Sequence, residues 1–162
     1  MSASTTASIT ASEAELAALQ RQARASGDPS VLVAALPYMQ FLGLAIEPDG
    51  DAVIGTMRYA PALIGDSTIP ALHGGTICAL LESTAIFRVL WSAEAGVLPK
   101  TITMTVDYLR SGRPVDTRCR ASIVRQGKRI AVVDVRAYQD DPEKPIATAI
   151  VHLLLASDGD TA

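Results

Sequence analysis

Cysteine and histidine are scarce in this chain, which has two of each among its 162 residues. Cys78 and Cys119 stand far apart, and no His, Cys or carboxylate grouping has the spacing of metal ligands. A zinc site and a disulfide scaffold are therefore both disfavoured. Two isolated thiols fit a reducing compartment, so we expect a cytoplasmic protein without a metal or other cofactor.

The sequence also lacks an excess of positive charge and a long apolar run. A net charge of −3 gives no reason to expect nucleic acid or an anionic membrane surface as partner. Apolar residues make up 49% of the chain, yet no uninterrupted run approaches the roughly 20 residues that span a bilayer. The first residues have neither the basic region nor the apolar core of a secretory signal. We expect one domain with a substantial core and no membrane partner.

The first forty residues predict a tail and a helical extension. Residues 1–11 are small and polar, and a helix is expected over 13–25, where Gly27-Asp28-Pro29 ends it. A second helical segment over 30–41 contains Pro37, which predicts a break or kink.

From Gly43 onward the pattern changes to strands around one long helix. Residues 44–59 predict a hairpin with a turn at 48–51, and 60–72 predict a loop. The helix is expected to end near Ala93, with Gly96 as its cap, and later strands are expected over 101–109, 117–125, 129–138 and 146–156. This order, a hairpin, a buried helix and a meander of about four strands, predicts an α+β fold in which a curved antiparallel sheet wraps around one helix.

The first strand after the helix alternates in character along its length. Ile102, Met104, Val106 and Tyr108 are expected on one face. Thr101, Thr103, Thr105 and Asp107 are expected on the other face.

The helix itself carries the most informative residue. From Thr76 to Ser92 only Glu82 and Arg88 are charged, and a helix without a polar face is normally buried. Burying an ionised carboxylate is costly unless it is paired or opens into a wet site. An ordinary acid turned to solvent is the alternative, but no Lys or Arg lies three or four residues away from Glu82. We therefore interpret Glu82 as a general base or nucleophile.

His73, Gly74 and Gly75 precede this helix and supply a second chemical feature. Two glycines let a ligand approach the backbone closely, and free N–H groups at a helix start favour developing negative charge. Such a turn can polarise a carbonyl, although two glycines can also simply make a tight turn. His73 fits a general acid, an orienting group or a packed structural residue, and His152 on the last strand fits a structural role. Ser83 is not in a nucleophile elbow, so a serine triad is not supported.

Basic residues cluster in the later turns. Arg125, Lys128 and Arg129 surround one tight turn, and Arg110 and Arg113 lie near another. Most of these side chains fit a solvated sheet surface. The alternative is that they bind the phosphates of a nucleotide-like carrier.

These motifs together resemble the hotdog-fold acyl-CoA thioesterases of the phenylacetate-degradation (PaaI-like) type. The resemblance rests on His73-Gly74-Gly75 with Glu82, on the run 101–110 and on the run 124–129. It extends from Phe41 to Leu155 and implies a hotdog domain over 41–157, followed by a tail over 158–162. It also implies active sites at a dimer interface, in a homodimer or a dimer-of-dimers homotetramer.

The resemblance implies roles for individual residues. Glu82 matches the catalytic acid, which is commonly Asp in the family, and Gly75 matches the residue whose N–H polarises the thioester carbonyl, with His73 beside it. Thr101 matches a position whose hydroxyl lies near the attacking water in some members. Substrate contacts are expected from Gly74, Thr101, Ser83, Arg125, Lys128 and Arg129.

The resulting hypothesis is hydrolysis of an acyl-CoA thioester, with an apolar acyl pocket formed by Ile77, Leu81 and a partner chain. The alternative is a hotdog domain that binds acyl-CoA without turning it over, as a sensor or carrier partner. A hotdog dehydratase is disfavoured, because the helix lacks the paired Asp and His of that family.

Overall fold

The computed structural model describes residues 13–66, 68–92 and 98–155. The expected polar N-terminal segment, the helix cap at Gly96 and the C-terminal tail lie outside the described residues. The helices are α1 (Glu13–Ser26), α2 (Ser30–Ala34), α3 (Pro37–Phe41) and α4 (Gly74–Ser92), and a 3-10 turn covers Pro61–Leu63. The strands are β1 (Leu44–Asp49), β2 (Ala52–Met57), β3 (Ile64–Asp66), β4 (Ile69–Leu72), β5 (Lys100–Tyr108), β6 (Thr117–Gln126), β7 (Ile130–Tyr138) and β8 (Ala147–Leu154).

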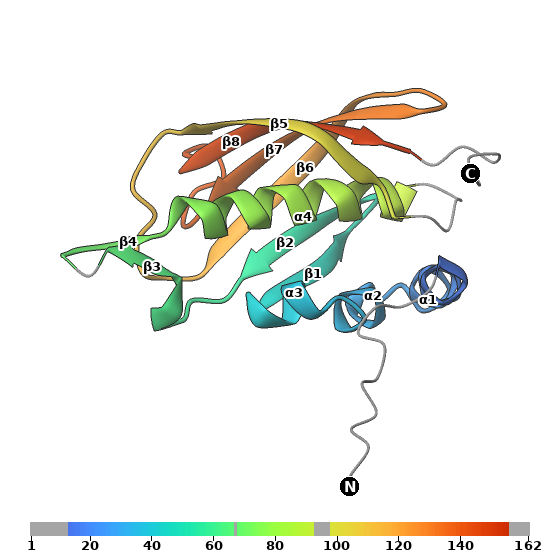
Figure 1. The fold of residues 1–162 in the computed structure, drawn as a ribbon, viewed down its shortest axis with the longest axis horizontal. Coiled ribbons are helices and arrows are strands. Elements are labelled where there is room, and N and C mark those ends of the chain that lie inside the picture. Colours follow the sequence, from blue (N-terminus) through green and yellow to red (C-terminus); the bar gives the residue numbers. More distant parts are fainter. Residues whose placement is uncertain (1–12, 67, 93–97, 156–162) are drawn as a thin grey trace, which may run out of the picture.

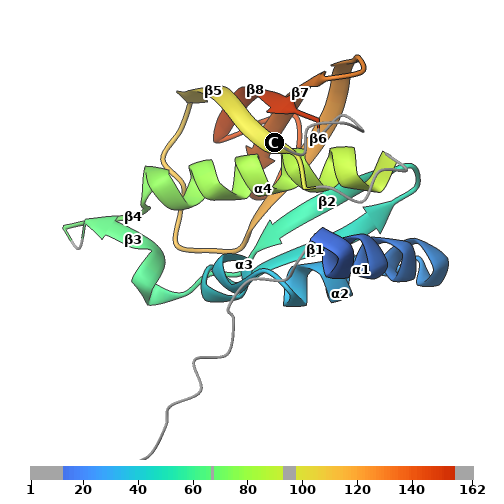
Figure 2. The same ribbon diagram turned by 45° about the vertical axis from the view of Figure 1, so that its right-hand side comes forward.

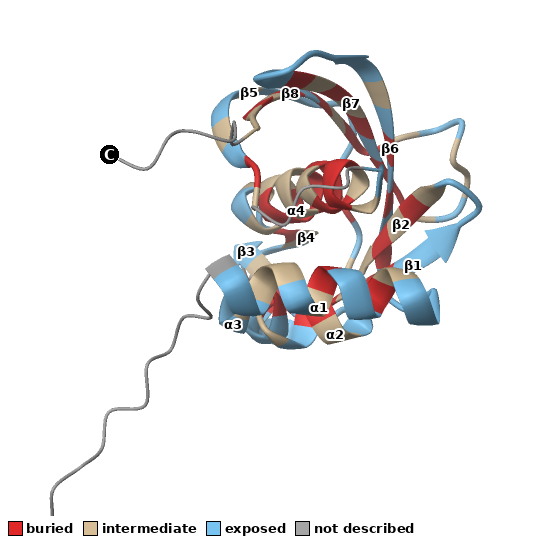
Figure 3. Ribbon diagram, turned by 90° about the vertical axis from the view of Figure 1, so that its right-hand side faces the viewer, coloured by how far each residue is buried: buried red, intermediate tan, exposed pale blue. Residues whose placement is uncertain are grey.

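Six strands form one antiparallel sheet in the order β1-β2-β6-β7-β8-β5. This sheet curves around α4, which runs along its concave side (Figure 1). The curvature is clearest in Figure 3, where α4 is seen nearly end-on and the sheet passes from β5 over it and down to β1. The predicted α+β fold, a curved antiparallel sheet around one long helix, is confirmed.

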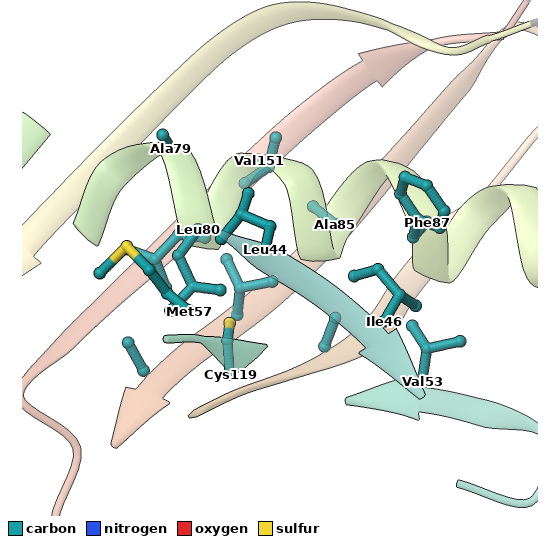
Figure 4. Packing of buried hydrophobic residues seen from close by; sticks show 14 of the residues in the cluster. Leu44, Ile46, Val53, Met57, Ala79, Leu80, Ala85, Phe87, Cys119 and Val151 are labelled. Atoms are coloured by element: carbon teal, nitrogen blue, oxygen red, sulfur yellow. The ribbon is translucent and has the colours of Figure 1, made fainter. Parts of the chain in front are cut away.

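The core lies between α4 and the concave face of the sheet. Leu80, Leu81 and Ala85 of α4 have no exposed surface, and they pack among apolar side chains from β1, β2, β6 and β8 (Figure 4). At the contact with β2, a Cβ atom added to Gly55 would lie 2.1 Å from the Oγ1 atom of Thr84. Glycine at this position therefore lets α4 approach the sheet closely.

The N-terminal helices form a layer beneath α4 and β1 (Figure 2). The break at Pro37 is confirmed, because α2 ends at Ala34 and α3 begins at Pro37. Helix α1 also supports the C-terminal end of α4. The Nε2 atom of Gln20 donates a hydrogen bond of 2.8 Å to the carbonyl of Leu90, and the Arg24 guanidinium donates one of 2.7 Å to the carbonyl of Trp91. These donors satisfy carbonyls that a helix end leaves without partners.

By length and composition alone, α4 is apolar enough to cross a membrane. Half of its apolar window is buried inside the fold, against the sheet. A core helix that is covered by a curved sheet has this same composition, and the packing of α4 accounts for it.

The position of β5 differs from the expected meander. Of the four strands that follow α4, β6, β7 and β8 are consecutive in the sheet, whereas β5 lies at its edge and pairs with β8. The expected alternation is also wrong at the start of β5. A bulge between Thr101 and Thr103 shifts the phase by one residue, so Thr101 pairs with Leu153 and Ile102 is 54% exposed.

The loop expected over 60–72 contains secondary structure of its own. After the 3-10 turn, β3 and β4 pair as a short, irregular hairpin that leads directly into α4. Pro61 and Pro70 favoured an irregular segment, but Pro70 occupies a strand of an isolated two-stranded pair, where a missing N–H is tolerated.

Candidate active site

The N-terminus of α4 is held by His73. The backbone N–H of His73 donates to the carbonyl of Leu63 (2.8 Å), and its own carbonyl accepts from the N–H groups of Thr76 (3.0 Å) and Ile77 (3.3 Å). Its imidazole Nδ1 accepts a hydrogen bond of 2.9 Å from the N–H of Gly75. His73 therefore caps the helix with its side chain, a role that His plays less often than Ser, Thr or Asp.

Because of this cap, the Gly75 N–H is not a free donor. The sequence predicts a free donor aimed at a substrate carbonyl, and the structure shows that the donor is already engaged by an imidazole. The acceptor belongs to an exposed side chain, so a rotation of the His73 side chain would free the Gly75 N–H for another acceptor. The same bond fixes Nδ1 as the unprotonated nitrogen of the ring.

Tyr108, at the end of β5, is a site residue that the sequence alone did not indicate. Its hydroxyl donates a hydrogen bond of 2.8 Å to the carbonyl of Gly74. A Cβ atom on Gly74 would lie 3.2 Å from the ring carbon and the hydroxyl oxygen of Tyr108, so the absence of a side chain lets the phenol lie against the helix start. Burial, and then the neighbouring Cys78 thiol, raise the pKa of Tyr108.

An open hollow of about 520 Å³ lies beside this helix start. Its lining comes from β4, the first turn of α4, the end of β5 and the segment that follows β5. The lining residues are Ala71, Leu72, Gly74, Ile77, Tyr108, Leu109, Arg110, Ser111 and Gly112. Of the two residues expected to form the acyl pocket, Ile77 lines this hollow, whereas Leu81 is fully buried in the core and does not line it.

Cys78 and Glu82 lie one turn apart on the same side of α4, and both are half-buried. Burial, and then the charge of Glu82, raise the pKa of the Cys78 thiol. Within residues 13–66, 68–92 and 98–155, no hydrogen bond or ion pair joins Glu82 to another side chain. Glu82 is therefore an unpaired carboxylate, partly open to water, on a helix whose only other charged residue is Arg88. No group of three His, Cys, Asp or Glu residues in the same part of the chain is placed to bind a metal ion.

Gly75 and Glu82 are separated along the helix axis. Seven residues of α-helix rise about 10 Å. Within one chain, the two groups therefore lie about two helical turns apart.

The remaining predicted residues lie elsewhere in the chain. Ser83 is half-buried next to Glu82 on α4. Thr101 is at the opposite end of β5 from Tyr108, and its Oγ1 atom is buried without a hydrogen-bond partner among the described residues. His152 pairs with Thr103 and Val132 in the sheet, away from the start of α4.

The basic turn, Arg125 to Arg129, lies at the other end of the sheet from Gly75. Leu154 pairs with Ile130, just after this turn, and also with Lys100 at the start of β5. Lys100 and Tyr108 are eight residues apart, which is about 26 Å of strand. Within one chain, therefore, Arg125, Lys128 and Arg129 are not beside the His73-Gly74-Gly75 turn, whereas Arg110 is.

Comparison with known proteins supports the assignment of the fold. Residues 70–146 match the family model of the thioesterase superfamily. The chain is 28% identical over 120 residues to the medium/long-chain acyl-CoA thioesterase YigI of Salmonella typhimurium, a match that covers 65% of this chain and 77% of YigI. The segment 70–146 is therefore similar to the thioesterase superfamily, and the chain has the hotdog fold.

Two solved structures illustrate the similarity. A protein from Chromobacterium violaceum is 36% identical, with a TM-score of 0.66 over 87% of this chain and 96% of that one. A phenylacetic acid degradation-related protein from Ralstonia eutropha JMP134 is 21% identical and shares the fold, with a TM-score of 0.66 over 74% of this chain and 89% of that one.

Proposed function

We propose that this protein is an acyl-CoA thioesterase that hydrolyses its substrate to a free acid and CoA. The observation that carries the proposal is Glu82, an unpaired, half-buried carboxylate on the central helix of a thioesterase-superfamily fold. The description of YigI as a medium/long-chain acyl-CoA thioesterase supports the choice of thioester. A cytoplasmic location is part of the proposal, in keeping with the two free thiols.

The carbonyl oxygen of the thioester would bind at the start of α4. It would replace the His73 imidazole as the acceptor of the Gly75 N–H, at the positive end of the helix dipole. Gly74 would let the acyl chain pass close to the backbone, and Ile77 would contact it in the hollow. Negative charge that develops on the carbonyl oxygen in the transition state would then be stabilised by a donor that is already oriented.

Glu82 would supply the second half of the chemistry, in one of two ways. As a general base it takes a proton from water while the water oxygen bonds to the carbonyl carbon. As a nucleophile its carboxylate attacks that carbon directly, and water hydrolyses the resulting anhydride. In both routes the carbon–sulfur bond breaks and CoA leaves as a thiolate, which then takes up a proton.

We further propose that Gly75 and Glu82 of one site come from two different chains. The two groups are separated by about 10 Å along the axis of one helix, and a dimer can bring them closer together. Two α4 helices that pack antiparallel about a two-fold axis would bring Gly75 of each chain to Glu82 of the other. The active form would then be a homodimer or a homotetramer with sites at the subunit interface. Ser83 and Thr101 would contact substrate from the same interface.

The CoA phosphates need a basic partner, because the protein as a whole is acidic. We propose that Arg125, Lys128 and Arg129 provide it. The pantetheine arm separates the thioester from the phosphates, so a basic turn distant from Gly75 suits a ligand of that length. These side chains are all exposed, as phosphate contacts at a channel mouth would be.

The decisive experiment measures release of free CoA with a thiol-reactive dye from a panel of aryl and aliphatic acyl-CoA thioesters. A thioesterase releases many equivalents of CoA per chain from at least one substrate. An acyl-CoA-binding sensor or carrier partner binds the same ligands in calorimetry and releases less than one equivalent. That second result would contradict the proposal.

A further inference from the structure

Tyr108, Gly74, Gly75 and His73 form one continuous chain of hydrogen bonds. The Tyr108 hydroxyl donates to the Gly74 carbonyl at 2.8 Å, and the Gly75 N–H donates to His73 Nδ1 at 2.9 Å. The Gly74 carbonyl and the Gly75 N–H belong to the same peptide unit. The phenol therefore acts on one end of the peptide whose other end is the candidate oxyanion donor.

We propose that Tyr108 is a positioning residue, which polarises and orients the Gly74–Gly75 peptide so that the Gly75 N–H becomes a stronger donor to the thioester oxygen. A hydrogen bond to a peptide carbonyl draws electron density from the peptide nitrogen and strengthens its N–H as a donor. It also fixes the plane of the peptide, so less reorganisation is needed when charge develops. This inference rests on the proposed thioesterase function.

The phenol is anchored independently of the helix that it contacts. Tyr108 pairs with Ala147 at the end of β5, and the next residue, Leu109, donates its N–H to the Ile146 carbonyl at 2.8 Å. The sheet thus holds Tyr108 against the helix start, which is also held by the hydrogen bonds from Leu72 to Gly112 and from His73 to Leu63. The raised pKa of Tyr108 keeps the hydroxyl protonated, and hence a donor, at neutral and mildly alkaline pH.

The test is Tyr108→Phe, which keeps the ring and removes the donor. One oxyanion donor contributes about 10²- to 10³-fold to kcat, and cooperativity strengthens a bond by about 10–30%, so we expect kcat to fall about two- to eightfold. KM should change little, because a ground-state carbonyl gains less from the polarised N–H than the transition state does. Tyr38→Phe, which removes a hydroxyl from an exposed ring on α3, is the matched control and should leave kcat unchanged.

A second readout does not depend on activity. With ¹⁵N-glycine labelling, the Gly75 amide proton is expected to move upfield in Tyr108→Phe, because its hydrogen bond weakens, and to stay in place in Tyr38→Phe. Gly74→Ala, whose Cβ would crowd the phenol at 3.2 Å, should shift the Gly75 signal in the same direction.

The two readouts separate the inference from the function beneath it. An active wild-type protein whose kcat and Gly75 shift both survive Tyr108→Phe would overturn the inference. A wild-type protein that turns over no thioester would instead contradict the proposed function. The Gly75 shift would then still show whether Tyr108 polarises the peptide.

Discussion

On α4, the Cys78 thiol lies one turn from the Glu82 carboxylate, so its reactivity depends on the charge of Glu82. Burial and then the charge of Glu82 raise the pKa of Cys78. Glu82→Gln removes the charge, so at pH 7 a larger fraction of Cys78 is thiolate and alkylation by iodoacetamide is expected to be faster than in the wild type. At a pH well above the pKa of Cys78 in either protein, the wild type and Glu82→Gln should react at similar rates.

Cys119 gives this measurement an internal reference. It has no exposed surface, and burial raises its pKa to about 12, so it should not react in the folded protein. Equal Cys78 alkylation rates in wild type and Glu82→Gln at pH 7 would show that no ionised carboxylate stands beside the thiol.

Site residues that stand out from their neighbours in the chain could be predicted from the sequence, whereas a site residue defined by a contact with a distant segment could not. Glu82 could be singled out because its helical neighbours are apolar, and His73-Gly74-Gly75 because they are consecutive. Tyr108 could not, since its bond to Gly74 spans 34 residues and depends on β5 lying at the sheet edge. The His73 cap was also missed, because an imidazole at a helix start is a weak signal.

At the scale of elements, the contact between α4 and β2 depends on Gly55. Gly55→Ala would place a Cβ atom 2.1 Å from Thr84 Oγ1, so helix and sheet must move apart. We expect the free energy of unfolding to fall by about 1–3 kcal/mol, measured by urea denaturation. Gly127→Ala is the matched control, because the nearest atom to its new Cβ is a carbonyl oxygen at 3.6 Å.

A double mutant locates the cause of this loss. Thr84→Ala removes the overlapping Oγ1 atom, so Gly55→Ala with Thr84→Ala should cost less than the sum of the single variants. Additive costs would mean that Gly55 is needed for some reason other than the approach of α4.

The β6–β7 turn is the element proposed to hold the CoA phosphates. Lys128→Ala with Arg129→Ala is expected to raise KM several-fold and leave kcat nearly unchanged, because phosphate contacts are equal in ground and transition states. The effect should shrink at high salt, which screens exposed charges. Arg110→Ala is the comparison, because Arg110 lines the hollow near Gly74. If only Arg110→Ala raises KM in low-salt buffer, the phosphates bind over the hollow and not at the turn.

The positions of the helices and strands in the sequence were predicted better than the pairing of the strands. Residue patterns gave the helices, the β1–β2 hairpin and the later strands closely, because periodicity and turn residues are local. They did not reveal that β5 pairs with β8, or that a bulge at Thr101 puts Ile102 on the outer face. Both features depend on pairing partners about fifty residues away in the chain.

For the whole molecule, the proposed shared site requires a particular position of the two-fold axis between the two chains. If Gly75 of each chain meets Glu82 of the other, the two-fold axis passes midway between them, next to Cys78. The two half-buried Cys78 thiols would then face each other across packed helices about 8–10 Å apart. A short bismaleimide should therefore convert the native protein to a covalent dimer on a denaturing gel.

Cys78→Ser should abolish this cross-link and Cys119→Ser should leave it intact, because Cys119 is buried. Light scattering on the same samples gives the size of the assembly. A fully active monomer, or an active dimer without the Cys78 cross-link, would contradict the antiparallel arrangement of α4 helices.

The proposed role of Glu82 as the group that carries the chemistry is tested most directly by steady-state hydrolysis with the Glu82→Gln variant. Amide for carboxylate preserves size and shape, and among the described residues no hydrogen bond or ion pair of Glu82 is lost, so the melting temperature should remain close to that of the wild type. We expect kcat on the best acyl-CoA substrate to fall by about 10²-fold or more, the scale of a lost positioned base. A folded Glu82→Gln protein with near-normal turnover would show that another group catalyses the reaction.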